Sequence, residues 1–327
     1  MNQYRRRMPI RRRLGSFGIF TIFIFIALCY GIVSIYRGLT HGDNLTEAGK
    51  IAEETRKKKA ETPIKLDLQL PINQWVATQD ADDSGIIIFD LDNNAVVGKH
   101  NENKSFRIES IYKMFVAYEG YRRISQGTYQ ANDTALNQNS YDGKPYTLEL
   151  CLDHMVRYSF SSCAESVWNR IGRKKLQKIY DDKGFSDTEI AGLTSTASEI
   201  KQLYQIFWRH EDLSEDTWAK IKDSMLNQTA PKSAADIYTS NWRQGLPSGF
   251  NTAKVYNKVG WLGDGDGNWL YYSDAAFLEF QEVTNQSGEK KPARHFIMVV
   301  LTKNTRPKEI KKLGQKVEAA IRSADNY

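Results

Sequence analysis

Histidine and cysteine are scarce in this chain, and their scarcity excludes several kinds of functional site. The 327 residues include five histidines and three cysteines. The histidines are scattered and form no HExxH pattern, and the cysteines have no CxxC spacing, so neither a zinc site nor a redox site is predicted. We therefore expect no metal and no other cofactor.

An excess of basic charge is also missing from most of the chain. The formal net charge is +6, and six arginines before the first apolar run account for it. These are Arg5, Arg6, Arg7, Arg11, Arg12 and Arg13. Nucleic-acid-binding domains concentrate Lys and Arg on their folded surface, whereas here only the short RKKK at 56–59 stands out. A nucleic-acid partner is not predicted.

One long apolar run lies near the N-terminus. Residues 17–36, FGIFTIFIFIALCYGIVSIY, carry no charge and span about 30 Å as a helix, the hydrocarbon thickness of a bilayer. A cleaved signal peptide would have a shorter apolar region with a small-residue cleavage site. A lipoprotein signal would have a small residue before its cysteine, but Cys29 follows Leu28. We predict an uncleaved transmembrane helix at the cell membrane, with residues 1–16 as a basic cytoplasmic tail and the rest outside the cytoplasm.

The segment after this run is predicted to be an extracellular linker. Residues 37–80 are polar and charged, and Pro63 and Pro71 interrupt any long helix there. We therefore place the folded domain at residues 81–327.

The hydrophobic pattern changes twice within residues 81–327. Two β-rich runs in 84–100 surround the turn sequence LDNN, which is typical of a hairpin. Apolar residues at helical spacing follow over about 109–230. Strand patterns return after residue 250, and residues 306–324 form an amphipathic pattern. This order predicts an α+β domain whose antiparallel sheet comes from both chain ends, flanked by helices, with a helical subdomain inserted.

Two of the three cysteines fall in the predicted extracytoplasmic domain. Cys29 lies in the apolar run, whereas Cys151 and Cys163 lie where disulfides persist. A bridge between them would close a short loop and stabilise the fold by about 3 kcal/mol. Two reduced, buried thiols are the alternative.

An SxxK spacing occurs three times in the sequence. The pairs are Ser110/Lys113, Ser198/Lys201 and Ser287/Lys290. Only Ser110 opens a strongly apolar helix directly after a sheet-type segment. There Lys113 would lie one turn later on the same face, within hydrogen-bond reach of the serine. A partly buried lysine with a lowered pKa can take the proton from a serine hydroxyl, so this pair is a candidate nucleophile and base.

In this context the sequence resembles the penicillin-recognising serine enzymes, specifically the class A β-lactamase-like group. The resemblance covers roughly residues 84–325 and rests on three motifs, S-x-x-K, S-D-N and K-T-G. The matching segments are Ser110-Ile-Tyr-Lys113, the phrase MVRYSFSSCAESVWNRIG at 155–172, and Lys258-Val-Gly260 preceded by GLPSG. The resemblance implies a β-lactamase/transpeptidase-like fold.

The same resemblance implies a role for each matched residue. Ser110 would be the acylated nucleophile, with Lys113 as its base. Ser159 would relay a proton to the leaving nitrogen, and Lys258 would hold the substrate carboxylate and lower the local proton affinity. The backbone N–H groups of Ser110 and of Trp261, which follows Gly260, would form the oxyanion hole.

Three departures from the family pattern affect what the site is expected to do. Phe160 and Ser161 replace the Asp and Asn of the second motif, and Ser161 offers only a short hydroxyl. Val259 replaces a hydroxyl-bearing residue of the third motif. The loop that carries the deacylating glutamate in class A enzymes is shortened here. Its Glu189 is either a substitute base or a solvated turn acid, and the turn acid is expected.

These features predict a membrane-anchored extracytoplasmic serine hydrolase that acts by an acyl-enzyme mechanism on a β-lactam or a cell-wall peptide amide. Without the loop glutamate, the acyl-enzyme is expected to persist. The alternatives are a catalytically impaired homologue that binds peptidoglycan, and a D-alanyl peptidase or esterase.

Overall fold

The computed structural model describes residues 66–136, 143–226, 242–284 and 288–325. The predicted cytoplasmic tail and the predicted transmembrane helix at 17–36 lie outside the described residues, as does most of the predicted linker. Within the described ranges, no helix combines the length and the apolar character needed to cross a bilayer.

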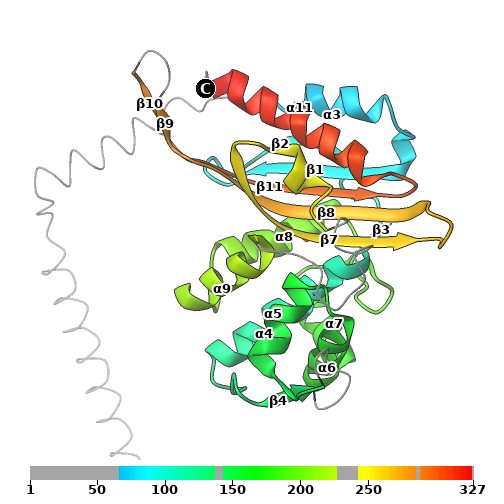
Figure 1. Cartoon of the computed structure of the whole chain (residues 1–327), viewed down its shortest axis with the longest axis vertical. Helices are drawn as coiled ribbons and strands as arrows, with labels where there is room; N and C mark the ends of the chain where they lie inside the picture. The colour runs from blue at the N-terminus through cyan, green and yellow to red at the C-terminus, as the bar shows by residue number, and fades with distance from the viewer. Residues whose placement is uncertain (1–65, 137–142, 227–241, 285–287, 326–327) are drawn as a thin grey trace, which may run out of the picture. The chain divides into compact units, whose positions relative to one another are not determined.

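A five-stranded antiparallel sheet forms the centre of the described chain, with the strand order β2-β1-β11-β8-β7 (Figure 1). The strands are β1 (Ser84–Asp90), β2 (Ala95–His100), β7 (Ala253–Gly263), β8 (Trp269–Phe280) and β11 (Arg294–Thr302). Strand β1 pairs with β11, and Ile87 lies opposite Val299. The sheet therefore joins the two ends of the domain, as the sequence predicted.

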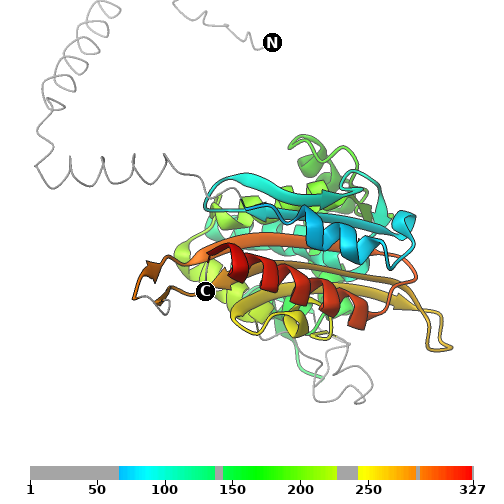
Figure 2. The same ribbon diagram turned by 90° about the horizontal axis from the view of Figure 1, so that it is seen from above.

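Two helices cover one face of this sheet, α3 (Gln69–Val76) and α11 (Pro307–Asp325), as Figure 2 shows from above. Trp75 is buried, and its Nε1 donates to the carbonyl of Glu309 at 2.7 Å. The folded part thus begins before residue 81, inside the segment predicted as linker. Pro71 does not prevent this helix, because it lies in the first turn, where proline is tolerated.

The opposite face of the sheet carries the helical subdomain (Figure 1). Its helices are α4 (Tyr112–Ser125), α5 (Leu148–Arg157), α6 (Ser161–Ile171), α7 (Arg173–Asp181), α8 (Ala197–Trp208) and α9 (Glu215–Leu226). All six coincide with segments whose apolar spacing predicted helices. Helix α8 is tied to the sheet by the buried Tyr204, whose hydroxyl donates to the carbonyl of Ala275 at 3.0 Å.

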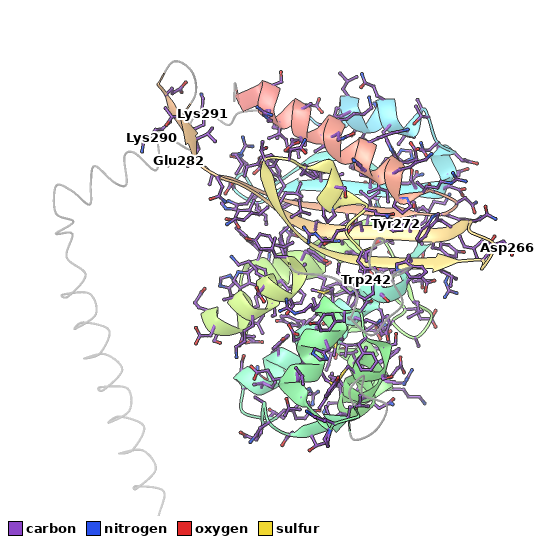
Figure 3. All side chains as sticks on the ribbon, viewed as in Figure 1. Trp242, Asp266, Tyr272, Glu282, Lys290 and Lys291 are labelled. Atoms are coloured by element: carbon purple, nitrogen blue, oxygen red, sulfur yellow. A yellow bond between two sulfur atoms is a disulfide. The ribbon has the colours of Figure 1, made fainter. Side chains whose placement is uncertain are left out.

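Several short elements have no counterpart in the sequence pattern. They are η1 (Ala81–Asp83), η2 (Glu109–Ile111), α10 (Leu246–Gly249), β3 (Phe106–Arg107), β4 (Thr134–Leu136), β5 (Tyr146–Thr147), β6 (Thr194–Ser195), β9 (Val283–Thr284) and β10 (Lys290–Lys291). Elements of two to four residues are too short to show a hydrophobic period. Figure 3 places Asp266 at the tip of the β7–β8 turn and Lys290 on the β9–β10 ribbon, at opposite ends of the sheet.

Candidate active site

Ser110 lies in the short 3₁₀ turn η2, directly before α4. This turn is positioned by strand β3, and the N–H of Ile108 donates to the carbonyl of Leu193 at 2.8 Å. Glu109 has a φ of +46°, a conformation that is uncommon for a residue other than glycine and that marks a tight turn held by its surroundings. The turn presents Ser110 half-buried at the start of a long buried helix.

Lys113 is buried one turn beyond Ser110, with a side chain that reaches the connection between α5 and α6. Its Nζ donates to the carbonyl of Ser159 at 2.5 Å, to Ser161 Oγ at 3.1 Å and to Ser159 Oγ at 3.3 Å. The expected hydrogen bond with Ser110 is not among the contacts of the described residues, in which Lys113 Nζ donates to these three acceptors instead. Burial lowers the pKa of Lys113 from 10.5 to about 7.

Ser159 is the point where the two candidate lysines meet. Its Oγ accepts from Lys258 Nζ at 3.0 Å in addition to Lys113. Ser159 has a φ of +53°, and this left-handed conformation ends α5 and precedes α6. The turn aims both the carbonyl and the hydroxyl of one residue at the buried Lys113.

Lys258 is fully buried on β7, the edge strand next to the helical subdomain. Its Nζ also donates to the carbonyl of Val259 at 2.9 Å. Burial, followed by repulsion from Lys113, holds the pKa of Lys258 well below its usual value, while Asp274 opposes the shift. Two buried amines this close cannot both keep a proton easily, so the site favours one neutral lysine near neutral pH.

Asp274 is a buried carboxylate near Lys258 that the sequence analysis did not single out. It accepts from Asn257 Nδ2 and from the N–H of Leu246, both at 2.9 Å. Burial raises the pKa of Asp274 to about 7. Its signal in the sequence is a single acid inside the apolar strand segment SDAAFL.

Gly260 allows β7 to pack directly against the turn that holds Ser110. A Cβ at this position would collide with the carbonyl oxygen of Ile108 and would lie 3.0 Å from the backbone N of Ser110. The main chain at Gly260, directly before Trp261, therefore lies beside the Ser110 amide. The Trp261 side chain packs against Trp269, with ring centroids 5.5 Å apart.

The substituted motif residues have different environments. Phe160 is buried at the start of α6 and belongs to the core of the helical subdomain. Ser161 is exposed, and its hydroxyl contacts Lys113. Val259 is buried in an apolar cluster that also contains Trp242 and Tyr272. Both of these residues are labelled in Figure 3.

Glu189, the acid of the shortened loop, does not join these residues. Its backbone pairs with Thr194 through bonds of 2.9 and 3.1 Å, and its side chain is exposed. The acids whose charges act on Lys113 are Glu165 and Glu109. The sequence analysis did not identify Glu165, although its position four residues after Ser161 was a signal.

A disulfide joins the two helices on either side of Ser159. Cys151 of α5 and Cys163 of α6 are bonded, with their Cα atoms 4.9 Å apart. Both cysteines are fully buried. The bridge fixes the connection that carries Ser159 and Ser161.

Metal-ligating side chains are not concentrated here. In the part of the chain that the structure describes, His, Cys, Asp and Glu nowhere form a group of three or more that could hold a metal ion.

The sequence model of the β-lactamase enzyme family, Beta-lactamase2, matches residues 68–323. The match covers more than half of the chain, so the chain belongs to the β-lactamase enzyme family. No curated protein sequence matches it significantly.

Similar folds occur among solved structures. PBP-A is 16% identical, with a TM-score of 0.62, over 78% of this chain and 96% of that chain. A class A β-lactamase from Bacteroides cellulosilyticus is 14% identical, with a TM-score of 0.59, over 79% of this chain and 99% of that chain. A PBP-A variant solved as an acyl-enzyme complex with penicillin G is 17% identical, with a TM-score of 0.59, over 80% of this chain and 100% of that chain. At these identities the likeness shows a shared fold and nothing more specific.

Proposed function

We propose that this protein is an acyl-transferring serine hydrolase that uses Ser110 as its nucleophile on a β-lactam or a cell-wall peptide amide. The observation that carries the proposal is the convergence of two buried lysines, Lys113 and Lys258, on the Ser159 hydroxyl. The Ser110 turn lies against β7, the strand that carries Lys258, at Gly260. A buried lysine pair has little structural use, because desolvation of each charge costs free energy.

Acylation begins with transfer of the Ser110 proton to Lys113. A lysine with a pKa of about 7 is partly neutral at physiological pH and can act as the base. The serine oxygen forms a bond to the substrate carbonyl carbon, and the N–H groups of Ser110 and Trp261 stabilise the resulting oxyanion.

Breakdown of this intermediate requires a proton on the leaving nitrogen. Ser159 gives up its hydroxyl proton and is reprotonated by a neighbouring lysine, since both lysines contact its Oγ. The C–N bond breaks and an ester on Ser110 remains. A substrate carboxylate near Lys258 would favour the ammonium form of that lysine and so anchor the substrate.

Deacylation is expected to be slow. Glu189 is exposed and contacts neither lysine, so it is poorly placed to activate water. The acyl-enzyme would persist, as in an enzyme that is trapped by penicillin rather than one that destroys it. The solved penicillin G acyl-enzyme of the similar PBP-A variant gives a precedent for such a complex in this fold.

The proposal includes a location for this chemistry. The uncharged run at 17–36 would anchor the chain in the cell membrane, and the arginine-rich residues before it would keep the N-terminus in the cytoplasm. The hydrolase domain would then face cell-wall material.

The test is covalent labelling of the full-length protein by a fluorescent penicillin. We expect the wild type to be labelled, with a mass increase of one penicillin on Ser110, and Ser110→Ala to remain unlabelled. Ser198→Ala is the matched control, because Ser198 also begins an SxxK sequence but its hydroxyl donates to Asn103 at 2.7 Å, away from the lysines. A folded wild type that is never labelled would remove the β-lactam part of the proposal.

A binding protein without catalysis is the second candidate. The absence of a Ser110–Lys113 hydrogen bond among the described contacts and the replacements Phe160, Ser161 and Val259 favour it. A panel of extracellular esters and D-alanyl peptides separates this candidate from a peptidase or an esterase. Turnover that disappears in Ser110→Ala supports catalysis, whereas peptidoglycan binding that is unchanged in Ser110→Ala supports the binding protein.

A further inference from the structure

Helix α6 places the carboxylate of Glu165 one turn beyond Ser161, which contacts Lys113. Ser161 and Glu165 are four residues apart on α6 and therefore share one face of the helix. Ser161 Oγ accepts from Lys113 Nζ at 3.1 Å. Glu165 thus extends the candidate site along α6, beyond Ser161.

A second element, helix α4, connects Glu165 to Lys113. Tyr112 precedes Lys113 in the chain, and its hydroxyl donates to Glu165 Oε1 at 3.1 Å. The Lys113 Nζ lies 5.9 Å from the centroid of the Tyr112 ring. The carboxylate is therefore held beside the lysine by that lysine's own neighbour.

Arg173, at the start of α7, provides the counter-ion of Glu165. It forms a salt bridge with Glu165 Oε2, and its guanidinium lies 4.2 Å from the centroid of the Trp168 ring. The Glu165 side chain is 42% exposed, so water and Arg173 both weaken its negative charge without removing it. Glu165 is thus fixed in place but still able to act on Lys113 electrostatically.

Three charged groups face Lys113 from the elements packed around it. Lys258 approaches from β7 and shares the Ser159 hydroxyl with Lys113. Glu109 lies on the Ser110 turn, where Arg107 Nε donates to its carboxylate at 2.7 Å. Glu165 lies on α6, and its charge raises the pKa of Lys113 more than that of Glu109 does.

We propose that Glu165 is a positioning residue of this site, because its carboxylate determines how readily Lys113 holds its proton. Arg173 weakens this effect by partly neutralising the Glu165 charge. This inference rests on the proposed function for its catalytic meaning. Its physical content, a coupling between two charges, does not depend on turnover. The shortened loop would thus leave the site with a carboxylate from a different element, acting through Lys113 rather than on water.

The experiment is an NMR titration of Lys113 in the full-length protein labelled with ¹³C-lysine. The Lys113 Cε signal is assigned by its loss in Lys113→Met. We expect Glu165→Gln to lower the titration midpoint of Lys113 by about 0.5 pH unit or more, because the negative charge with the largest effect on Lys113 is lost. Arg173→Gln should move the midpoint in the opposite direction, because the Glu165 charge is then less neutralised.

The matched control is Glu189→Gln, which removes an exposed acid without a contact to either lysine and should leave the midpoint unchanged. An unchanged midpoint in both Glu165→Gln and Arg173→Gln would overturn the proposal, as would an equal shift in the control. The pH at which penicillin labelling is half-maximal should shift with the NMR midpoint in each variant. A wild type that titrates as expected but is never labelled would instead count against the proposed function alone.

Discussion

At the scale of single residues, the chemistry of this site depends on burial. Lys113 and Lys258 are ordinary amines in the sequence, and it is their removal from water around the Ser159 hydroxyl that lowers the pKa of both. The sequence predicts Ser110 at the start of the helix that carries Lys113, and the structure places Ser110 in the 3₁₀ turn η2 directly before that helix, α4. The sequence does not predict that Lys113 contacts Ser159 and Ser161 instead of Ser110, because that depends on the left-handed turn between α5 and α6.

The pH dependence of acylation follows from the pKa of Lys113. The base must be neutral to accept the Ser110 proton, and the folded pKa is about 7 instead of 10.5. We expect the labelling rate to rise with pH through about 7 and then to level off, measured with a fluorescent penicillin between about pH 5 and 9. Lys113→Arg, which keeps its charge throughout this range, should be labelled at least about 100-fold more slowly. A midpoint near the value of a free lysine would contradict this assignment.

At the scale of elements, two contacts hold the site together. Strand β7 packs against the turn η2, and a disulfide joins α5 to α6. Neither contact can be predicted from one segment, because each depends on how two elements pack. Gly260 is the residue through which the first contact occurs. Cys151 and Cys163 provide the second.

Gly260→Ala should separate β7 from the Ser110 turn. The added methyl group would meet backbone atoms of Ile108, which cannot yield as a flexible side chain can. We expect a loss of about 1–3 kcal/mol in the free energy of unfolding and at least about 100-fold slower labelling. Gly263→Ala is the control on the same strand, since its Cβ would approach only Asn268 O, at 3.2 Å. Equal labelling of the two variants would show that the contact is unimportant for the site.

Removal of the disulfide should destabilise the helical subdomain. The bridge spans 12 residues, and the double variant Cys151→Ala, Cys163→Ala should lose about 3 kcal/mol in the free energy of unfolding. Denaturant unfolding of the double variant and of the wild type, with and without reductant, measures this loss. Reductant should destabilise only the wild type. Identical midpoints for all four samples would be inconsistent with a bridge.

At the scale of the whole domain, the two chain ends must meet before the site exists. Strand β11 lies between β1 and β8, and α11 crosses the sheet face opposite the helical subdomain. Gly249 and Gly314 allow α10 and α11 to approach closely, since a Cβ on Gly314 would lie 3.1 Å from the Gly249 Cα. Helix α11 thus packs against α10, and α10 in turn contacts β7.

Gly314→Val should overpack this contact and lower the free energy of unfolding by about 1–3 kcal/mol, measured by thermal or denaturant unfolding. Gln315→Val places the same side chain on the exposed face of α11 and controls for the helix propensity of valine. A wild-type midpoint for Gly314→Val would mean that the two helices separate at little cost in free energy.

The amino-acid sequence by itself determined the order of the five strands of the central sheet, of helices α4 to α9 and of α11, because long segments show their hydrophobic period locally. It also determined which serine is the candidate nucleophile, since only Ser110 opens a strongly apolar helix and has motif partners downstream. The tertiary structure alone decided that Lys113 and Lys258 converge on Ser159, that Glu165 and Asp274 lie near them, and that Glu189 does not. These relations join residues that are far apart in the chain, and burial, which sets their charges, exists only once the sheet and the helical subdomain have packed together.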